Sequence, residues 1–432
     1  MIATNIGTNE LNHLTFAGMD TVDLAKEYGT PVYLMDEARI RENVRTYRKA
    51  LSEAFSGRAD IFYAGKACAF TELYRILTEE GAGIDVVSRG ELFTARKAGY
   101  PVNKACFHGN NKTDEDLRCA VSSGVGYICV DSMDELLALE KICAEMSERQ
   151  AILIRVTPGI DPHTYEAVST GKVDSKFGNA IATGQAEEII RKALTMRHLN
   201  LKGIHCHVGS QVFAEDVFER AADVMLRFMA DMREKTGRTL EVLDLGGGYG
   251  VRYTEDDPVL SIPEKIREVA AAVKAACDEL DFPVPYIYLE PGRSIVADAG
   301  MTLYTVGSVK RIPGYRSYVS VDGGMSDNPR YALYRSRYTV FSAGEVEARE
   351  TERFSVVGRL CESGDILQEN VPLPCDIRRG DTLAVCTTGA YNYAMASLYN
   401  RLPRPPIVML RDGTSRVVVR RETLANVADL DV

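Results

Sequence analysis

Short β-rich runs alternate with helical stretches between residues 60 and 293, and this alternation constrains the fold more than any other feature of the 432-residue chain. Strict alternation of β and α units implies parallel strands joined by right-handed crossovers. Eight such units in this length predict a closed (β/α)8 TIM barrel, with a doubly wound open sheet as the alternative. The runs are DIFYAGKA (60–67), GIDVVSRG (83–90), ACFHGN (105–110), YICVDS (127–132), AILIRV (151–156), KGIHCHVGS (202–210), EVLDLGGG (241–248) and YIYLEPGR (286–293).

Helix-start signals follow several of these runs. Ser132 and Glu135 have the spacing of a capping box and precede apolar residues at helical spacing, and Ser88 with Glu91 repeats the pattern. These signals support helical crossovers between the strands.

The chain changes character after about residue 300, where β-rich runs are no longer separated by long helical segments. Asp412-Gly413, between the last two runs, is a hairpin signal. We therefore predict a barrel over residues 31–299 and a second, all-β domain of Greek-key or β-barrel type over residues 300–432, which residues 1–30 join.

Composition excludes several classes of function. The formal net charge is −10 and there is no basic block, which argues against a nucleic-acid partner. No apolar run reaches the roughly 20 residues of a membrane span, and the N-terminal residues lack a signal-peptide layout. The ten cysteines are scattered singly, as in a reducing compartment. We expect a cytoplasmic protein without a membrane partner.

The least regular segment is residues 158–178, which are rich in Pro, Gly and polar residues. Such a long loop inside a compact domain is usually functional, so we expect this one to serve the site.

Polar residues end every predicted barrel strand. In a (β/α)8 barrel these ends meet at one face, where the chemistry takes place. For Ser88 and Asp131 a helix-capping role is the simpler interpretation. The set comprises Lys66, Asp85, Ser88, His108, Asn110, Asp131, Arg155, His205, His207, Asp244, Gly246 to Gly248, Glu290 and Arg293.

Lys66 has two interpretations. A lysine ending a buried strand can extend its ammonium into water, or it can be a partly desolvated amine that attacks carbonyl compounds. The glycines 246–248 follow the seventh run, where barrel enzymes commonly hold a phosphate. Glu290 could keep a pyridine nitrogen protonated. Together these features suggest pyridoxal 5′-phosphate as cofactor.

The alternating pair His205 and His207 also permits a metal site, because residues i and i+2 of a strand point to the same side. Such a site needs further ligands, and only His108 is well placed among the remaining histidines. We therefore predict no metal, with His207 stacked on the cofactor ring and His205 structural.

Nine motifs, spread over nearly the whole chain, occur together in one known family. They are YGTPVYLMD (28–36), FYAGKAC (62–68), GIDVVSRGEL (83–92), HVGSQ (207–211), DLGGGYG (244–250), EPGRSIVADAG (290–300), VDGGMSDNPRYALY (321–334), GRLCESGDIL (358–367) and TTGAYNYAMAS (387–397). In these motifs the chain resembles the fold-type III pyridoxal phosphate decarboxylases, the family that acts on ornithine, arginine and diaminopimelate, and most closely its diaminopimelate branch.

The resemblance implies a set of site residues. Lys66 would hold the cofactor covalently, Cys361 would donate a proton, and His207 and Glu290 would act on the cofactor ring. The implied cofactor-binding residues are Lys66, Asp85, His207, Ser210, Gly247, Gly248, Glu290, Pro291, Gly292, Arg293 and Tyr391. The implied substrate-binding residues are Arg293, Arg330, Tyr334, Glu362 and Tyr391.

These substrate-side residues suit a long diamino diacid, because guanidinium groups bind carboxylates bidentately and Glu362 can pair with a distal ammonium. The resemblance also implies a homodimer in which the CESGD segment enters the partner's active site. Ornithine, arginine or carboxynorspermidine decarboxylases, and a non-catalytic regulator of the same fold, are the alternatives. Arg330 argues against the first group, and retention of Lys66, Glu290 and Cys361 against the second.

Overall fold

The computed structural model describes residues 1–160 and 174–432, so most of the loop predicted at 158–178 lies outside the described residues. The chain divides into two compact units. A barrel unit comprises residues 43–250 and 260–292, and a sheet unit comprises residues 1–42, 251–259 and 293–432.

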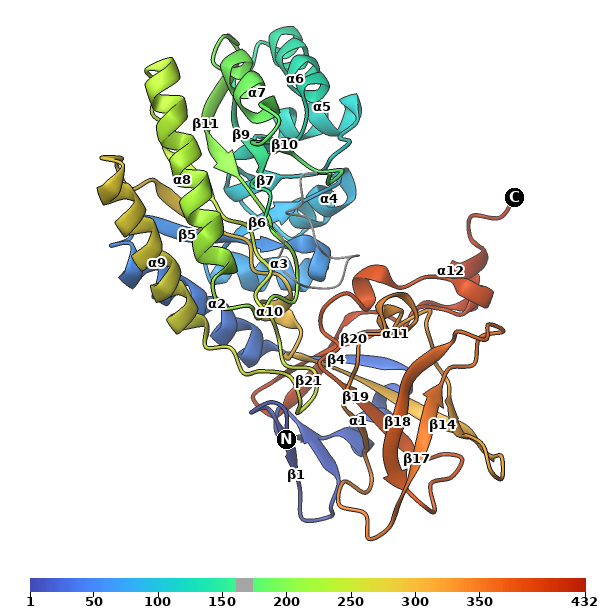
Figure 1. The fold of residues 1–432 in the computed structure, drawn as a ribbon. Helices are drawn as coiled ribbons and strands as arrows, with labels where there is room; N and C mark the ends of the chain where they lie inside the picture. Colours follow the sequence, from blue (N-terminus) through green and yellow to red (C-terminus); the bar gives the residue numbers. More distant parts are fainter. Residues whose placement is uncertain (161–173) are drawn as a thin grey trace. The chain divides into compact units, whose positions relative to one another are not determined.

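The barrel unit is a closed ring of eight parallel strands, which confirms the predicted (β/α)8 barrel (Figure 1). Each predicted β-rich run supplies one strand. The strands are β5 (Ala59–Ala64), β6 (Gly83–Val86), β7 (Ala105–Phe107), β8 (Tyr127–Val130), β9 (Gln150–Thr157), β11 (Leu199–His205), β12 (Val242–Asp244) and β13 (Tyr286–Leu289), with the short β10 (Asn179–Ala180) paired to β9.

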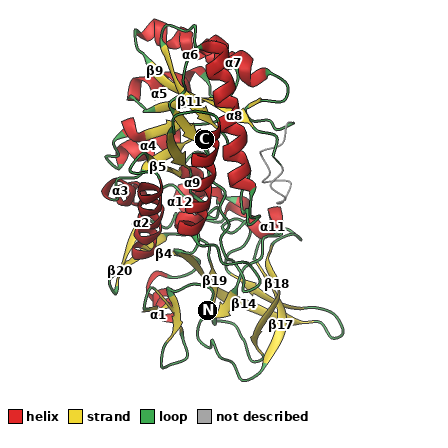
Figure 2. Cartoon of the chain, turned by 60° about the vertical axis from the view of Figure 1, so that its left-hand side comes forward, coloured by secondary structure: helices red, strands yellow, loops and turns green. Residues whose placement is uncertain are grey.

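Helices connect these strands, and α8 and α9 lie side by side on the outside of the barrel (Figures 1 and 2). The helices are α3 (Thr71–Glu79), α4 (Arg89–Lys97), α5 (Asp114–Ser123), α6 (Met133–Met146), α7 (Gln185–Ala193), α8 (Val217–Thr236) and α9 (Ile262–Glu279), with 3-10 turns η1 (Gly65–Ala67) and η2 (Val102–Lys104).

The two serine caps were predicted correctly, with one difference. Ser88 and Ser132 accept the backbone N–H groups of Glu91 and Glu135 at the starts of α4 and α6. The glutamates return their hydrogen bonds one residue earlier than a capping box does, to the N–H groups of Val87 and Asp131.

The interior of the barrel is packed with side chains. Phe62, Cys106, Cys129, Leu153 and Val242 form one buried cluster that draws on five different strands. Short parallel strands that are buried on both faces read as nearly continuous apolar runs, which explains the sequence pattern.

The sheet unit contains a mixed sheet with the order β18-β17-β15-β14-β4-β20-β21, to which β16 and β19 attach through β14. Most pairs are antiparallel, but β4 with β20 and β15 with β17 are parallel. Its strands are β4 (Val32–Asp36), β14 (Gly300–Arg311), β15 (Ser317–Val321), β16 (Val340–Ser342), β17 (Thr351–Val357), β18 (Ile366–Pro374), β19 (Thr382–Cys386), β20 (Ile407–Arg411) and β21 (Thr414–Val419).

The remaining elements of the sheet unit are short, apart from α2, which begins in this unit and runs into the barrel unit. They are β1 (Ile6–Thr8), β2 (Leu14–Phe16), β3 (Met19–Asp20), α1 (Thr21–Tyr28), α2 (Glu37–Ala54), α10 (Arg293–Val296), α11 (Arg330–Tyr334), α12 (Leu424–Ala428) and the 3-10 turns η4 (Tyr393–Met395) and η5 (Tyr399–Arg401).

The N-terminal residues share the core of the sheet unit, where Ile6, Leu14 and Phe16 pack with Leu34 and Leu303. The compact unit extends further than our predicted boundary at residue 31, because β4 pairs with β14 and β20. Asp412 and Gly413 both have positive φ, 50° and 72°, as the predicted hairpin turn requires.

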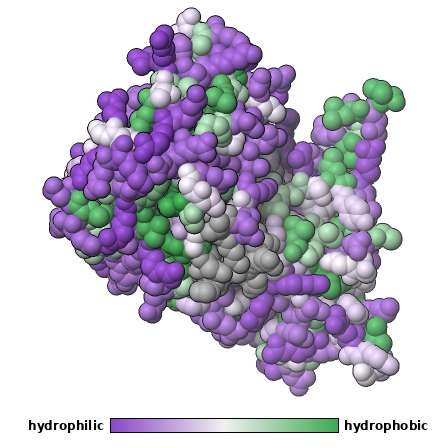
Figure 3. Space-filling view, turned by 45° about the horizontal axis from the view of Figure 1, so that its top comes forward, coloured by the Kyte–Doolittle hydropathy of each residue, from purple (hydrophilic) through white to green (hydrophobic). Residues whose placement is uncertain are grey.

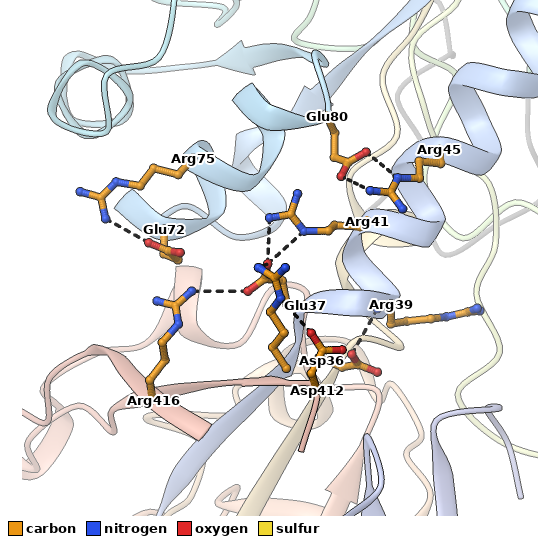
Figure 4. A network of polar contacts seen from close by, with 11 residues as sticks. Asp36, Glu37, Arg39, Arg41, Arg45, Glu72, Arg75, Glu80, Asp412 and Arg416 are labelled. Atoms are coloured by element: carbon orange, nitrogen blue, oxygen red, sulfur yellow. Dashed lines mark hydrogen bonds and ion pairs between the residues drawn. The ribbon is translucent and has the colours of Figure 1, made fainter. Parts of the chain in front are cut away.

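A buried carboxylate ties the start of α2 to the β20–β21 hairpin (Figure 4). Glu37 is 1% exposed and accepts hydrogen bonds from Arg41 at 2.8 Å, Arg411 at 2.9 Å and Arg416 at 3.4 Å. Three guanidinium groups therefore compensate the burial of one negative charge.

Most of the face drawn in Figure 3 is hydrophilic, in keeping with the 26% of charged residues. Among the described residues, none of the helices has the length and apolar character needed to cross a membrane.

Candidate active site

Lys66 lies in η1, directly after β5. The Lys66 side chain is exposed, so our expectation of an amine desolvated by the protein's own packing was wrong. The strand ends at Ala64, and in the turn that follows Gly65 and Ala67 are buried while the Lys66 side chain reaches solvent. The turn is fixed by close backbone packing, because a Cβ at Gly65 would lie 2.8 Å from the carbonyl oxygen of Asp85.

The EPGR segment packs against the same turn. The N–H of Ala64 donates to the carbonyl of Pro291 at 3.2 Å, and a Cβ at Gly292 would lie 2.9 Å from the Cβ of Ala64. The structure thus brings Lys66 and the backbone after Glu290 into one neighbourhood of the barrel unit.

The glycine triplet after β12 forms a tightly packed backbone surface. A Cβ at Gly247 would lie 2.0 Å from the carbonyl oxygen of Glu290, and one at Gly248, whose φ is +122°, would lie 2.1 Å from that of Gly209. Only glycine fits there, so the loops after β11, β12 and β13 meet through their main chains. A bare backbone of this kind suits the close approach of a phosphate.

His207 is half-buried, and its Nδ1 accepts the N–H of Gly247 at 3.3 Å. Burial, together with the positive charges of Lys66 and Arg155, holds the pKa of His207 well below its ordinary value. The ring is therefore neutral, with its proton on Nε2, which suits stacking on a cofactor ring. The N–H of Gly247 is committed to this histidine, which leaves Ser210, half-buried after β11, and Gly248 as the phosphate-side candidates.

Glu290 follows β13 and is 5% exposed. Its Oε1 lies 2.9 Å from Nε2 of His108, and its Oε2 lies 3.1 Å from Nε2 of His205. Burial alone would raise the pKa of Glu290, but the two imidazoles overcome that effect and hold it well below the ordinary value. The glutamate is thus an anion inside the barrel.

Two further carboxyl groups are buried near this pair. Asp85 Oδ1 lies 3.9 Å from Nε2 of His108, and Asp244 accepts the N–H of Gly246 at 2.9 Å. Burial raises the pKa of both groups, and that of Asp244 goes well above its ordinary value.

The metal alternative predicted from His205 and His207 is not supported by their positions. Among the described residues, two groups have possible ligand atoms within 4.8 Å of one another. The first is His108, Cys129 and His205; the second is His108, His205, Asp244 and Glu290. His207 belongs to neither group.

The other polar strand ends have local roles. Arg155 Nε lies 3.9 Å from Asp131 Oδ1, and Asn110 is exposed. Asp131 precedes the cap of α6 and is not itself the cap.

The sheet unit contains two buried arginines set among tyrosines. Arg293 donates to the hydroxyl of Tyr253 at 2.8 Å, and Arg330 donates to that of Tyr338 at 2.8 Å. The Arg330 guanidinium also lies over the Tyr253 ring, 4.4 Å from its centroid, and that of Arg293 lies over Tyr391 at 4.7 Å. One tyrosine, Tyr253, therefore contacts both guanidinium groups.

Arg330 is 4% exposed, and within residues 1–160 and 174–432 no carboxylate lies within ion-pair distance of it. Its guanidinium also donates a hydrogen bond to Ser336 Oγ at 3.1 Å. Burial opposes the charge, but the nearby tyrosine oxygens hold the pKa of Arg330 above its ordinary value. A buried cation without a counter-ion favours binding of an anion.

Two further tyrosines that were predicted at the site, Tyr391 and Tyr334, belong to the same unit as these arginines. Tyr391 is half-buried and has φ 59°, a left-handed conformation that is uncommon for a tyrosine and concentrates at functional sites. Tyr334 ends α11 and is half-buried.

Cys361 and Glu362 lie at the surface of the sheet unit. The base of their loop is fixed by Asp365, which accepts the N–H groups of Met325 at 2.6 Å and Leu360 at 2.8 Å. The loop thus presents an exposed thiol and carboxylate from a rigid base.

The sequence reasoning missed Tyr253 and Tyr338. Tyr253 follows the glycine motif by five residues, and the loop after a seventh barrel strand is a recognised functional position. That signal could have singled out Tyr253. Tyr338 carries no signal in the sequence.

An exposed lysine, a glycine-lined backbone surface and a buried anionic glutamate suit a barrel that holds pyridoxal phosphate, and the comparisons agree. Residues 37–297 match the family model described as "Pyridoxal-dependent decarboxylase, pyridoxal binding domain". The chain belongs to this family of pyridoxal-dependent enzymes.

Several of its relatives within the family are diaminopimelate decarboxylases. The chain is 43% identical over 424 residues to the diaminopimelate decarboxylase of Bacillus subtilis, covering 98% of this chain and 96% of the relative. It is 46% identical to that of Actinosynnema pretiosum, covering 97% and 92%. The crystal structure of the M. jannaschii diaminopimelate decarboxylase with L-lysine superposes with a TM-score of 0.91 at 32% identity, covering 99% and 98%.

Proposed function

We propose that this chain decarboxylates meso-2,6-diaminopimelate to L-lysine and carbon dioxide, the last step of lysine biosynthesis. The names of the relatives support this reaction. The observation that carries the choice of substrate is the buried Arg330, whose guanidinium lacks a carboxylate partner among the described residues.

Arg330 separates this substrate from those of related decarboxylases. Diaminopimelate has a second carboxylate, which remains after the first is lost, whereas ornithine and arginine end in cationic groups. A guanidinium buried among tyrosines would repel such a cation, but it would bind the second carboxylate through two charge-assisted hydrogen bonds. Arg293 and Tyr334 lie on the same unit and would complete the binding of the substrate's polar ends.

Pyridoxal phosphate, when bound, supplies an electron sink for the electron pair that the departing carboxylate leaves behind. Lys66 Nζ would hold the cofactor covalently, and exposure of this amine leaves it open to exchange with the amine of the substrate. The neutral ring of His207 would stack on the cofactor and exclude water, and Glu290 would hold a proton at the pyridine nitrogen.

The remaining cofactor-side residues would bind the phosphate and the rim of the ring. Ser210, Gly248 and the backbone from Pro291 to Arg293 are the proposed phosphate ligands, with Tyr391 closing over it. Asp85, buried beside His108, would add to the polar surroundings of the ring.

We also propose that the enzyme acts as a homodimer in the cytoplasm. Cys361 and Glu362 are exposed on a loop with a rigid base, as expected for residues that act in the active site of a partner subunit. There Cys361 Sγ would donate a proton to the carbon that has lost its carboxylate, and Glu362 would pair with the distal ammonium. All ten cysteines are unpaired, as in a reducing compartment.

The purified protein, loaded with cofactor, should be supplied separately with meso-diaminopimelate, ornithine and arginine. We expect lysine from the first and no amine product from the other two. Turnover of ornithine at a comparable rate would refute the proposed role of Arg330. Borohydride reduction and peptide mass analysis should place the cofactor's mass on Lys66, and finding it on another peptide would refute that assignment.

Complementation tests the shared site. Lys66→Ala and Cys361→Ala are each expected to be inactive, and co-refolding them in equal amounts should recover about a quarter of the wild-type activity, because half of the dimers are mixed and each has one intact site. The absence of recovery in mixtures shown to be dimeric would contradict a shared site.

A further inference from the structure

Two imidazoles contact the buried Glu290, and these contacts are the basis of the inference. His108 follows β7 and His205 ends β11, so the two imidazoles come from separate strands. Each places its Nε2 against a different oxygen of Glu290, at 2.9 Å and 3.1 Å. Each oxygen thus faces its own imidazole, Oε2 in a hydrogen bond with His205 and Oε1 in an ion-pair contact with His108.

The two rings also support each other. Their centroids lie 4.8 Å apart in an edge-on arrangement, and both side chains are at most 5% exposed. Neither ring can rotate away from Glu290 without disturbing the other. The pair behaves as one rigid holder.

Asp244 provides an internal comparison. It is fully buried a few ångströms away and receives one backbone N–H, from Gly246. Burial raises the pKa of Asp244 well above its ordinary value, whereas the pKa of Glu290 is held well below. The imidazoles lower the pKa of Asp244 as well, but their contacts at 2.9 Å and 3.1 Å are with Glu290, whose negative charge adds to the rise at Asp244.

The titratable groups around His108 and His205 are consistent with imidazoles that have an N–H on the Nε2 facing Glu290. The other titratable groups near them are Asp85, Cys106, Cys129, His207, Asp244 and Lys66. Burial lowers the pKa of His205, but Glu290 and Cys129 raise it to about 9.

We propose that His108 and His205 are positioning residues that keep Glu290 ionised and correctly oriented, and thereby set the protonation of the cofactor's pyridine nitrogen. This inference rests on the family's use of pyridoxal phosphate and on the role proposed for Glu290. A protonated Glu290 would carry its own O–H and could no longer stabilise a proton on the pyridine nitrogen. The histidines therefore control the electron sink without touching the substrate.

The test replaces each histidine and reads the cofactor directly. The variants are His108→Leu and His205→Leu, which remove the donor, and His108→Gln and His205→Gln, which keep an N–H near the position of Nε2. Each is loaded with pyridoxal phosphate labelled with 15N in the ring, and the 15N chemical shift reports protonation of that nitrogen. His198→Leu is the matched control, since it breaks another histidine–carboxylate pair of the same unit, with Glu140 at 2.9 Å.

We expect the 15N shift of both Leu variants to move toward the unprotonated form, with kcat about 10- to 100-fold lower, a usual cost of losing a residue that orients an active-site ligand. The Gln variants should stay close to the wild-type shift, as should the control. With a cofactor analogue that has carbon in place of the ring nitrogen, the Leu substitutions should no longer change kcat relative to the wild-type chain.

Wild-type 15N shifts in the Leu variants would overturn the proposal. If a Leu variant does not bind the cofactor, the same histidine is replaced by Asn, whose shorter side chain places its N–H donor one bond further from Glu290. A wild-type 15N shift in that Asn variant would also overturn the proposal. The 15N shift needs no substrate, so the result is independent of whether diaminopimelate is the substrate.

Discussion

Arg330→Lys is the substitution that tests the substrate assignment most directly. Lysine keeps the positive charge but loses the planar fork of donors and the stacking on Tyr253. In the proposed function Arg330 binds the carboxylate that the reaction leaves in place. The substrate and L-lysine both carry that carboxylate, whereas cadaverine carries none.

The expected size of the effect follows from the contacts. A hydrogen bond to a charged group contributes about 1.5–3 kcal/mol, and the substitution removes one of the two that a guanidinium can donate to a carboxylate. The 4% exposure of Arg330 leaves little solvent to replace the lost bond. A loss of about 2 kcal/mol corresponds to roughly 30-fold weaker binding.

The assay measures KM for meso-diaminopimelate and inhibition constants for L-lysine and cadaverine on the cofactor-loaded enzyme. KM and the L-lysine constant should rise together, about 30-fold, while the cadaverine constant and the cofactor absorbance stay unchanged. Arg337→Lys is the matched control, because this nearby arginine is 61% exposed and pairs with Asp256 at 2.9 Å. Equal weakening of L-lysine and cadaverine would refute the reasoning, since it would show a general distortion of the site.

Three further predictions concern the sheet unit. Tyr253→Phe should raise KM about five- to tenfold with little change in kcat, because it removes the hydroxyl that holds Arg293 but keeps the ring beneath the second guanidinium; a fall in kcat at constant KM would argue against this. Glu37→Gln should lower the free energy of unfolding by about 1–3 kcal/mol, measured by denaturant titration, because three arginines lose their buried anionic partner. The effect is limited because two of these arginines, Arg411 and Arg416, are half exposed, and an unchanged free energy of unfolding would show that the ion pairs contribute nothing. Burial raises the pKa of Asp327 to about 7, so between about pH 4 and 7 the folded chain retains a proton that the unfolded chain releases. The stability contributed by this group therefore falls as pH rises through that range. In Asp327→Asn the slope of the free energy of unfolding against pH should be less negative, and an identical slope would contradict the assignment.

The barrel could be predicted from the sequence because its signal is repeated. Eight apolar runs with polar ends each specify a strand and the face at which it ends, so an error in one run would not have changed the fold. The sheet unit was harder to predict from the sequence. Its β4 immediately precedes a long helix and reads like another β/α unit, yet it pairs with β14 and β20, which lie more than 260 residues further along the chain.

The site was predictable as a set of residues but not as a set of contacts. The sequence indicates that Glu290 and His205 end barrel strands, but which imidazole meets which oxygen depends on register and on ring orientation. His108 therefore read as one polar strand end among many, although it lies 2.9 Å from Glu290. The exposure of Lys66 was mispredicted for the same reason, since it depends on how far a turn extends beyond the strand.

The two units bury charges of opposite sign, and in the proposed function one charge serves the cofactor and the other the substrate. In the barrel unit a buried anion, Glu290, is held by imidazoles and suits a cationic ring nitrogen. In the sheet unit a buried cation, Arg330, is held by the Tyr338 hydroxyl and the Tyr253 ring and suits a carboxylate. Because Glu290 and Arg330 lie in different units, a change in Arg330 or Tyr253 should alter which amino acid is bound and leave the cofactor's electronics intact, whereas a change in His108 or His205 should do the reverse. Substrate preference in such a chain can therefore change through the sheet unit alone, with the barrel chemistry unaltered.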